Sequence, residues 1–261
     1  MSSKLEELSS IRKRILSCAV KAREGHIPTS FSILEILFSF YNAQMQTYKA
    51  IERSPDKFVL SKGHAAIGLY AVLEHFKLIP KDWLDNLCEF ESPLGGHPDQ
   101  NKVPYVQAST GSLGHGLPIG VGMALGNRIL GRSSKTYVLV GDGELNEGSN
   151  WESILIAAHH NLYELSVVVD CNESSERAVK MGNLSNKFES FGWTVAEVDG
   201  HSIPDLQNYF MRDSAGCFQA PNVLLAKTIK GKGIKRMENS PEWHHKMPSE
   251  RELEEMILEL Q

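Results

Sequence analysis

The residues TYVLVGDGE, from Thr136 to Glu144, begin a segment with the pattern of a strand, a helix and a second strand. The first apolar run ends in a sharp turn at Gly141-Asp142-Gly143, and a helical pattern then extends from Trp151 to His160. A second apolar run, Leu165 to Val169, leads into Asp170-Cys171-Asn172. Short β-branched runs on either side of a helix predict a βαβ unit with parallel strands.

Two polar residues follow the predicted strands directly. Asp142 and Asn172 both lie at carboxyl ends, and ligands of open α/β sheets bind in the crevice at that edge. Their side chains offer hard oxygen ligands that suit Mg²⁺ or Ca²⁺, with phosphate oxygens and water completing the coordination. Gly141 and Gly143 allow the backbone to approach an anion closely. The unit is therefore suited to hold a metal-bound diphosphate.

A Gly-Asp-Gly tripeptide on its own is more often a simple turn than a binding site. Here it is followed by Asn172 at the next strand end, and Glu144-Leu145-Asn146-Glu147-Gly148 extends the motif. This combination resembles the signature of thiamine diphosphate enzymes, and it is similar to the transketolase branch of that superfamily. The resemblance implies thiamine diphosphate and Mg²⁺ as cofactors, with Ca²⁺ as the alternative metal.

Size and composition are those of an ordinary globular protein. The chain has 261 residues, 41% of them hydrophobic and 23% charged, which is enough for one large domain with a full core. The net charge of −5 gives no reason to expect a nucleic-acid partner. The four cysteines form no CxxC pair, and no apolar run suits a signal peptide or a membrane span, so we expect reduced thiols and a cytoplasmic protein.

Helical and strand patterns alternate along the whole chain. Helices are expected at residues 4–23, 30–44, 151–160, 183–191 and 204–211, in the Gly/Ala-rich segment between Gly114 and Leu130, and after Ser249, where Glu252 offers a capping box. Further strands are expected at residues 58–60, 193–198 and 221–226, and a loop at residues 177–182. We therefore expect one thiamine diphosphate-binding domain over residues 1–261, of the α/β class, with a mostly parallel sheet and helices on both faces.

Four histidine contexts resemble transketolase motifs in their order along the chain. They are Gly25-His26, Ser61-Lys62-Gly63-His64-Ala65, Gly96-His97-Pro98-Asp99 and His244-His245. A single loop histidine is more often a surface residue, but imidazoles suit a reaction in which sugar hydroxyls and carbonyls exchange protons near neutral pH. The resemblance implies that His26, His64 and His97 face the thiazolium and the substrate. It also implies that His245, or its neighbour His244, reaches the diphosphate and the substrate.

The resemblance implies further roles around the Gly-Asp-Gly turn. Gly111 and Leu113 match positions that contact the cofactor rings. Asp142 and Asn172 match the metal ligands, and the third ligand is expected to be the backbone carbonyl of Ser174. Glu147 matches an interface carboxylate coupled to the catalytic glutamate of the partner, although a carboxylate in the first turn of a helix is also common for local reasons. The cofactor-binding set is completed by His64, Gly141, Gly143, Glu144, His244 and His245.

Several positions depart from the family pattern. Ser112 stands where proline is common, His115 where glutamine is common, and Pro28-Thr29 replace the small residues usual after the first histidine. The segment 173–181 lacks the pattern usual after the metal-binding asparagine. These differences concern substrate specificity more than cofactor binding.

The chain resembles only the first of the three domains of a full transketolase. The glutamate that activates the aminopyrimidine and the arginines that hold a sugar phosphate belong to the domains that follow. We therefore expect the N-terminal subunit of a split transketolase, which transfers a two-carbon ketol unit between sugars together with a C-terminal subunit, as a heterotetramer. The apolar helix 30–44 and the small-residue helix after Gly114 are candidate interfaces.

Two other functions fit parts of the same pattern. The chain could belong to another thiamine enzyme, resembling either deoxyxylulose phosphate synthase or the α subunit of a 2-oxoacid dehydrogenase. The dehydrogenase subunit has no need of this histidine set, and the synthase is normally one longer chain. The chain could also be a non-catalytic cofactor-binding subunit, against which the presence of Asp142, Asn172, His64 and His97 argues.

Overall fold

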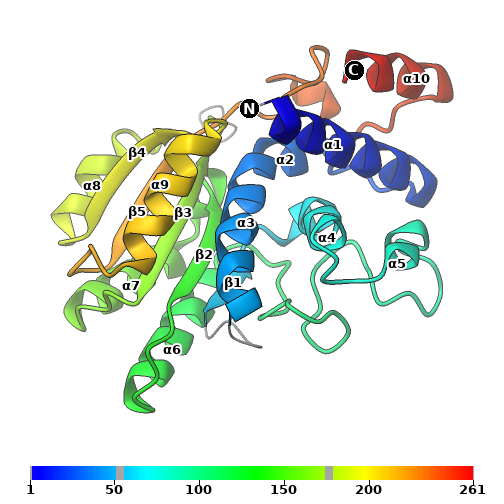
Figure 1. Cartoon of the computed structure of the whole chain (residues 1–261). Helices are drawn as coiled ribbons and strands as arrows, with labels where there is room; N and C mark the ends of the chain where they lie inside the picture. Colours follow the sequence, from blue (N-terminus) through cyan, green and yellow to red (C-terminus); the bar gives the residue numbers. More distant parts are fainter. Residues whose placement is uncertain (1, 51–55, 174–178, 261) are drawn as a thin grey trace.

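Five parallel strands form the centre of the molecule in a computed structural model that describes residues 2–50, 56–173 and 179–260. The strands follow the order β1-β2-β3-β5-β4 across the sheet (Figure 1). In register, Gly141 is paired with Asp170, and Cys171 with Lys227, so the carboxyl ends of the central strands lie side by side. The strands are β1 (Lys57–Leu60), β2 (Thr136–Gly141), β3 (Leu165–Cys171), β4 (Thr194–Asp199) and β5 (Asn222–Lys227).

Helices precede and connect the strands. The α-helices are α1 (Ser2–Ala22), α2 (Ile27–Ser32), α3 (Leu34–Ala50), α4 (Ala66–His75), α5 (Lys81–Asp85), α6 (Gly116–Ile129), α7 (Gly148–His159), α8 (Leu184–Ser190), α9 (Ile203–Ser214) and α10 (Glu250–Glu259). Short 3-10 turns occur at η1 (Gly63–Ala65), η2 (Gly143–Asn146) and η3 (Pro241–Trp243).

The alternation of side chains along the strands divides the core into two layers. In β2, Tyr137 and Leu139 point to one face of the sheet, where they pack in the same cluster as buried residues of α3 and α9. Val138 and Val140 point to the other face, where they pack with α6, α7 and α8. Because both faces are covered, every residue of β2 is buried, as expected for a central parallel strand.

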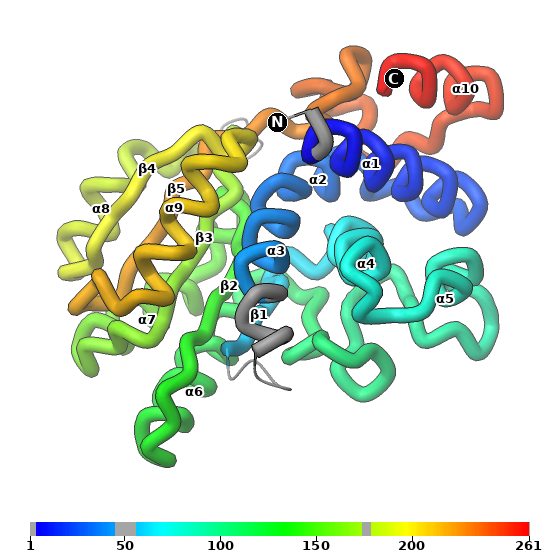
Figure 2. The backbone as a smooth tube through the Cα atoms, in the orientation of Figure 1, coloured from blue at the N-terminus to red at the C-terminus, as the bar shows by residue number. Residues whose placement is uncertain are grey.

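The remaining helices extend the first layer to one side of the sheet. Helix α1 packs against α4 and α10, and α4 packs against α5. Figure 2 shows that the segment after β5 returns to the N-terminal helices, so that the two ends of the chain lie near each other. This return brings residues near 244 against α2, because a Cβ on Gly25 would lie 2.6 Å from the backbone oxygen of His245.

One predicted element differs in its boundaries and in its role. The helix expected over residues 30–44 is two helices, since α2 ends at Ser32 and Ile33 takes φ −105° and ψ 4°. Helix α2 also begins earlier, with Pro28 in its first turn, where the missing N–H of proline costs no hydrogen bond. The apolar face of α3 is buried inside this chain, so this segment is not the interface that the sequence suggested.

The other elements agree with the sequence within a few residues. Ser249 and Glu252 form the predicted capping box at the start of α10. Residues 179–182 form no helix or strand, and the rest of the loop expected at 177–182 lies outside the described residues. Among the described helices, none combines the length and the apolar character that crossing a bilayer requires.

Candidate active site

Several polar residues lie at the edge of the sheet where the parallel strands have their carboxyl ends. Lys62 and His64 follow β1, Asp142 follows β2, Asn172 follows β3, and Lys230 follows β5. A cleft of about 400 Å³ opens there, and its lining includes Asp142, Cys171, Lys227 and Thr228. The crevice predicted from the Gly-Asp-Gly unit is therefore present at the expected edge.

A buried carboxylate, Asp170, organises this edge. Its Oδ2 accepts hydrogen bonds from Ser32 Oγ at 2.7 Å and Asn172 Nδ2 at 2.9 Å, and it forms an ion pair with Lys62. Its Oδ1 accepts a hydrogen bond from the hydroxyl of Thr228. Burial raises the pKa of Asp170, but Lys62 and the hydroxyl donors outweigh burial and hold the pKa below its ordinary value. The carboxylate thus ties together α2 and the segments that follow β1, β3 and β5.

Asp142 and Asn172 lie at neighbouring strand ends, as predicted. Asp142 Oδ1 accepts a hydrogen bond of 2.6 Å from the backbone N–H of Gly143, which fixes the turn. Burial, followed by the negative charge of Asp170, raises the pKa of Asp142. The amide nitrogen of Asn172 is turned toward Asp170, so the ligand atom it offers to a cation is its oxygen. A divalent cation beside Asp142 would offset the repulsion between the two carboxylates.

Glu144 is placed differently from the other residues of its motif. Its carboxylate is 2% exposed and accepts hydrogen bonds from the backbone N–H groups of Gly114, at 2.9 Å, and Gly141, at 3.2 Å. It also accepts one from the hydroxyl of Ser61. The side chain therefore stabilises the turn through these hydrogen bonds. Only the backbone of Glu144 remains a candidate for cofactor contact.

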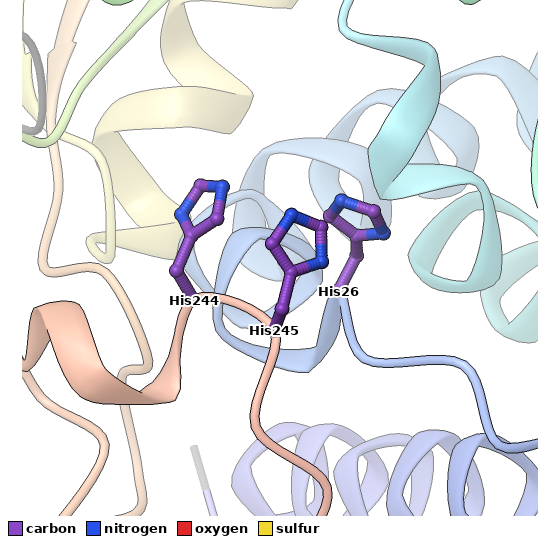
Figure 3. A group of neighbouring side chains, drawn as sticks. All are labelled: His26, His244 and His245. Atoms are coloured by element: carbon purple, nitrogen blue, oxygen red, sulfur yellow. The ribbon is translucent and has the colours of Figure 1, made fainter.

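Four of the predicted histidines lie close together. The ring of His26 lies 5.4 Å from that of His64, 4.2 Å from that of His245 and 6.1 Å from that of His244, measured between centroids. Figure 3 shows His26 beside the adjacent His244 and His245, which come from a segment far away in the sequence. The Nδ1 atom of His26 donates to Glu24 Oε1 at 2.8 Å, which leaves its Nε2 as the acceptor in the neutral ring.

Three of these histidines, His26, His64 and His244, are held in their neutral forms. Burial, followed by the nearby charge of Lys62, lowers the pKa of His64 to about 2. Burial and Lys230 lower the pKa of His244 to about 4, and burial also lowers that of His26. Neutral imidazoles can accept and donate protons in turn, whereas imidazolium ions only donate.

Lysines make this cluster a better site for an anion than for a metal. The ligand nitrogens of His26, His244 and His245 lie within 4.8 Å of one another, a spacing that a metal ion could bridge. However, Lys230 Nζ lies 2.9 Å from His244 Nδ1, and an ammonium group can only donate to that nitrogen. The other nitrogen of His244 then carries the proton, and the positive charge of Lys230 opposes a bound cation. Burial and Lys62 lower the pKa of Lys230 to about 8, so it remains mostly charged at neutral pH.

The other described residues of the predicted site lie on the loops before α6 and at the start of α7. His97 is exposed, and a Cβ on Gly111 would lie 3.2 Å from its ring, so these two predicted residues lie close together. Leu113 is half-buried, and Glu147 is exposed beside Gly114, where a Cβ would lie 2.5 Å from that of Glu147. Ser174, the expected third metal ligand, lies outside the described residues.

Sequence reasoning missed the two residues that hold the site together. Lys62 of the Ser-Lys-Gly-His motif was assigned no function from the sequence. Asp170 was noted only as the residue that ends an apolar run. The available signal was chemical, because a charged residue in a mostly apolar strand that is buried needs an ionic partner. Sequence reasoning also missed His201 and Arg12, which contact the loop after β5, and Glu35, which contacts both of these side chains.

Comparisons with known proteins show the family of this chain. Residues 4–257 match the family described as transketolase, thiamine diphosphate binding domain. One subunit of the apulose-4-phosphate transketolase of Phocaeicola vulgatus is 36% identical over 95% of this chain and 90% of that relative. The subunit of the same name from Actinobacillus succinogenes is 38% identical, over 95% and 92%. Human transketolase is 35% identical, but the alignment covers 98% of this chain and 42% of that protein.

Solved structures support the fold in the same way. A transketolase mutant from Pichia stipitis aligns with a TM-score of 0.83 at 24% identity, covering 98% of this chain and 40% of that one. The transketolase of Leishmania mexicana aligns with a TM-score of 0.82. This chain thus spans less than half of the single-chain transketolases and most of the two separate bacterial subunits. The chain belongs to the transketolase thiamine diphosphate-binding family, as an N-terminal subunit of the split transketolase type.

Proposed function

We propose that this chain binds the diphosphate of thiamine diphosphate together with Mg²⁺, and that a second chain supplies the pyrimidine-binding domain. The assembled enzyme transfers a two-carbon ketol unit between sugars. The observation that carries the proposal is the placement of Asp142 and Asn172 at adjacent strand ends, facing the same edge as Lys230 and His244. Oxygen ligands and cationic donors on one edge suit a metal-bound diphosphate.

The donor set suits magnesium and its phosphate partner. The oxygens of Asp142 and Asn172 would hold the metal, with Ca²⁺ as the alternative, and Ser174 is the remaining proposed ligand. Lys230 and His244 would donate to diphosphate oxygens, which favours His244 over His245 as the diphosphate contact. A Cβ on Gly141 would lie 3.9 Å from Lys62, its nearest contact, so room for a ligand remains beside the turn.

The histidines would handle protons at the substrate. The bound cofactor supplies the carbanion chemistry, which its own thiazolium ring makes available. The Nδ1 proton of His26 is held by Glu24. The Nε2 lone pair of that ring can therefore accept a hydrogen bond from a substrate hydroxyl. His64 donates or accepts in its neutral form, with Thr29 Oγ1 at 3.3 Å from its Nε2. His245, whose ring lies 4.2 Å from that of His26, and the exposed His97 complete the proposed substrate contacts.

We propose a sugar phosphate as the substrate. The names of the relatives from Phocaeicola vulgatus and Actinobacillus succinogenes specify apulose 4-phosphate, which makes this compound the first acceptor or donor to test. Phosphate recognition is expected on the second chain. The four cysteines are free thiols, which supports a reducing, cytoplasmic setting.

The assembly is proposed to be a heterotetramer with two copies of each chain. Exposed apolar residues on α6 and α7 support an interface there, namely Ile119, Ile129, Leu155 and Ile156. Glu147 is exposed at the start of α7, where it would meet the partner and couple to its catalytic glutamate.

The test is Asp142→Ala in the assembled complex, with cofactor binding measured by calorimetry at fixed Mg²⁺. We expect affinity for thiamine diphosphate to fall by at least ~100-fold while circular dichroism stays unchanged, because one of the metal ligands is lost. Asp205→Ala, an exposed first-turn carboxylate of α9, is the matched control and should bind normally. Wild-type affinity in Asp142→Ala would refute the proposed site.

A further inference from the structure

The turn after β4 reaches the loop after β5 through a histidine that the proposed chemistry does not use. His201 Nδ1 lies 3.0 Å from Glu35 Oε2, and its Nε2 lies 2.8 Å from the backbone nitrogen of Ile229. A backbone N–H can only donate, so Nε2 is the acceptor and carries no proton. The proton must lie on Nδ1, which donates to Glu35. The chain itself therefore fixes the tautomer of His201.

Glu35 connects this histidine to Arg12 on α1. Its carboxylate is 5% exposed, and its Oε1 accepts a hydrogen bond of 2.5 Å from Arg12 Nη2. Burial raises the pKa of Glu35, but His201 and Arg12 outweigh burial and hold the pKa below its ordinary value. A second donor of Arg12, Nε, bonds to the backbone oxygen of Lys232 at 2.9 Å.

The three side chains therefore hold the loop 228–233 by two hydrogen bonds to its backbone, and Glu35 joins the two side chains that make these bonds. His201 holds the N–H of Ile229, and Arg12 holds the carbonyl of Lys232. Lys230 lies between these two points and reaches His244. Thr228, one residue before the first point, bonds to Asp170. Displacement of this loop would move Lys230, the proposed donor to the diphosphate. It would also move Thr228, which bonds to the carboxylate that positions Asn172.

We propose that Arg12, Glu35 and His201, named here the loop clamp, are positioning residues that set the affinity for the cofactor diphosphate. The loop clamp contacts the backbone of the loop and not the proposed ligand. Its loss should therefore raise the KM for the cofactor and leave kcat of the cofactor-saturated enzyme nearly unchanged. The proposal rests on the proposed function for the identity of the ligand.

The first experiment compares His201→Leu with His201→Gln. In the purified chain, we expect the amide of Ile229 to exchange hydrogen about tenfold faster in His201→Leu, because that N–H loses its acceptor. In the assembled complex, the KM for thiamine diphosphate should rise about tenfold with kcat at saturation within about twofold of wild type. Glutamine at position 201 has an oxygen to accept and an NH₂ to donate, so it should restore most of both values.

The matched control is a histidine–carboxylate pair away from the loop. His75 Nε2 lies 3.0 Å from Glu7 Oε2, between α4 and α1. His75→Leu removes the same type of contact and should leave both the exchange of Ile229 and the cofactor KM unchanged.

Glu35→Gln provides a second test without a change of shape. His201 and Arg12 donate to different oxygens of the Glu35 carboxylate, and glutamine keeps only one of these oxygens, so its NH₂ group must face one of the two donors. We expect a higher cofactor KM than in wild type. The double variant Glu35→Gln/His201→Leu should be little worse than the more affected single variant, because the residues act through one loop.

Two results would overturn the loop clamp. One is unchanged exchange at Ile229 in His201→Leu, and the other is a fall in kcat with no change in the cofactor KM. Failure of the proposed function is distinguishable, because loop exchange is measured without cofactor. Faster exchange in a chain whose wild-type complex binds no thiamine diphosphate would support the clamp and refute the cofactor.

Discussion

Lys62 and Asp170 form an ion pair whose side chains are only 3% and 0% exposed. Transfer of both charges from water is costly, and the pair persists because Ser32, Asn172 and Thr228 complete the hydrogen bonding of the carboxylate. The positions of Thr228 and Asn172 depend on this carboxylate, because both side chains donate to it. A buried charge pair therefore has a geometric role here in addition to its energetic one.

Removal of one partner should leave the other charge buried and unpaired. We expect Lys62→Met to lower the free energy of unfolding by about 3–5 kcal/mol, measured by urea denaturation of the lone chain. Lys227→Met is the control, since its ion pair with Glu197 is exposed and should contribute little to stability. A change below about 1 kcal/mol in Lys62→Met would show that water or a rearranged side chain compensates Asp170.

His64 should make the stability of the fold depend on pH. Its folded pKa of about 2 lies below its ordinary value of 6.5, so between these values the unfolded chain binds a proton that the native chain does not. Stability contributed by neutral His64 is thus complete above pH 6.5 and is lost as pH falls. As the pH falls from 6.5 to 4.5, we expect the free energy of unfolding to decrease by about 1–2 kcal/mol less in His64→Gln than in wild type.

Denaturation with urea at several pH values measures this difference. His159→Gln, at the exposed end of α7, is the control and should follow the wild-type curve. Parallel curves for wild type and His64→Gln would mean that the imidazole titrates as it does in the unfolded chain.

Helix α6 shows how glycines can have opposite roles within one element. A Cβ on Gly120 would lie 2.3 Å from Val138 Cγ2, so the helix approaches β2 more closely than alanine would allow. A Cβ on Gly122 would meet nothing within 4 Å. The close approach at Gly120 fixes the distance between α6 and the strand that carries the Gly-Asp-Gly turn.

Substitution by alanine should therefore change stability in opposite directions. Gly120→Ala should destabilise the lone chain by about 1–3 kcal/mol through overpacking. Gly122→Ala should stabilise it by about 0.5–1 kcal/mol, because alanine loses less backbone entropy in a helix. Melting temperatures of the two variants test this, and a gain of stability in both would mean that α6 shifts freely on the sheet.

Elements with strong local patterns were predictable from the sequence. The βαβ unit and the capping box at Ser249 have signals within a few residues, and the structure confirms both. The break at Ile33 was not predictable, because apolar residues continue on both sides and no glycine or proline marks it. The ion pair of Lys62 with Asp170 and the bond from His201 to Ile229 join residues distant in sequence, and only the folded topology brings them together.

At the scale of the whole molecule, the two faces of the sheet differ in what they leave exposed. The apolar residues of α3 are buried in the core of the chain itself. On the opposite layer, Leu155 and Ile156 of α7 are 57% and 44% exposed. Since α6 packs beside α7, the exposed residues of both helices give this layer an apolar surface suited to a partner.

The last prediction is that the lone chain is inactive and that the surface of α6 and α7 binds its partner. In the proposed two-chain enzyme, the carboxylate that activates the aminopyrimidine comes from the second chain, and Glu147, exposed at the start of α7, would couple to it. Turnover should appear only when a chain with the pyrimidine-binding domain is added, and it should saturate at equal amounts of the two chains.

Leu155→Asp should weaken this association at least about tenfold, because it places a charge on an apolar contact, and should leave the stability of the lone chain nearly unchanged. Met211→Asp is the matched control, since Met211 is 66% exposed on α9, which covers the other face of the sheet. Sedimentation velocity and an activity titration measure both effects. Ketol transfer by the lone chain would refute the two-chain enzyme. Equal weakening by the two variants would move the interface away from α7, because a contact confined to that layer cannot depend on a residue of the opposite one.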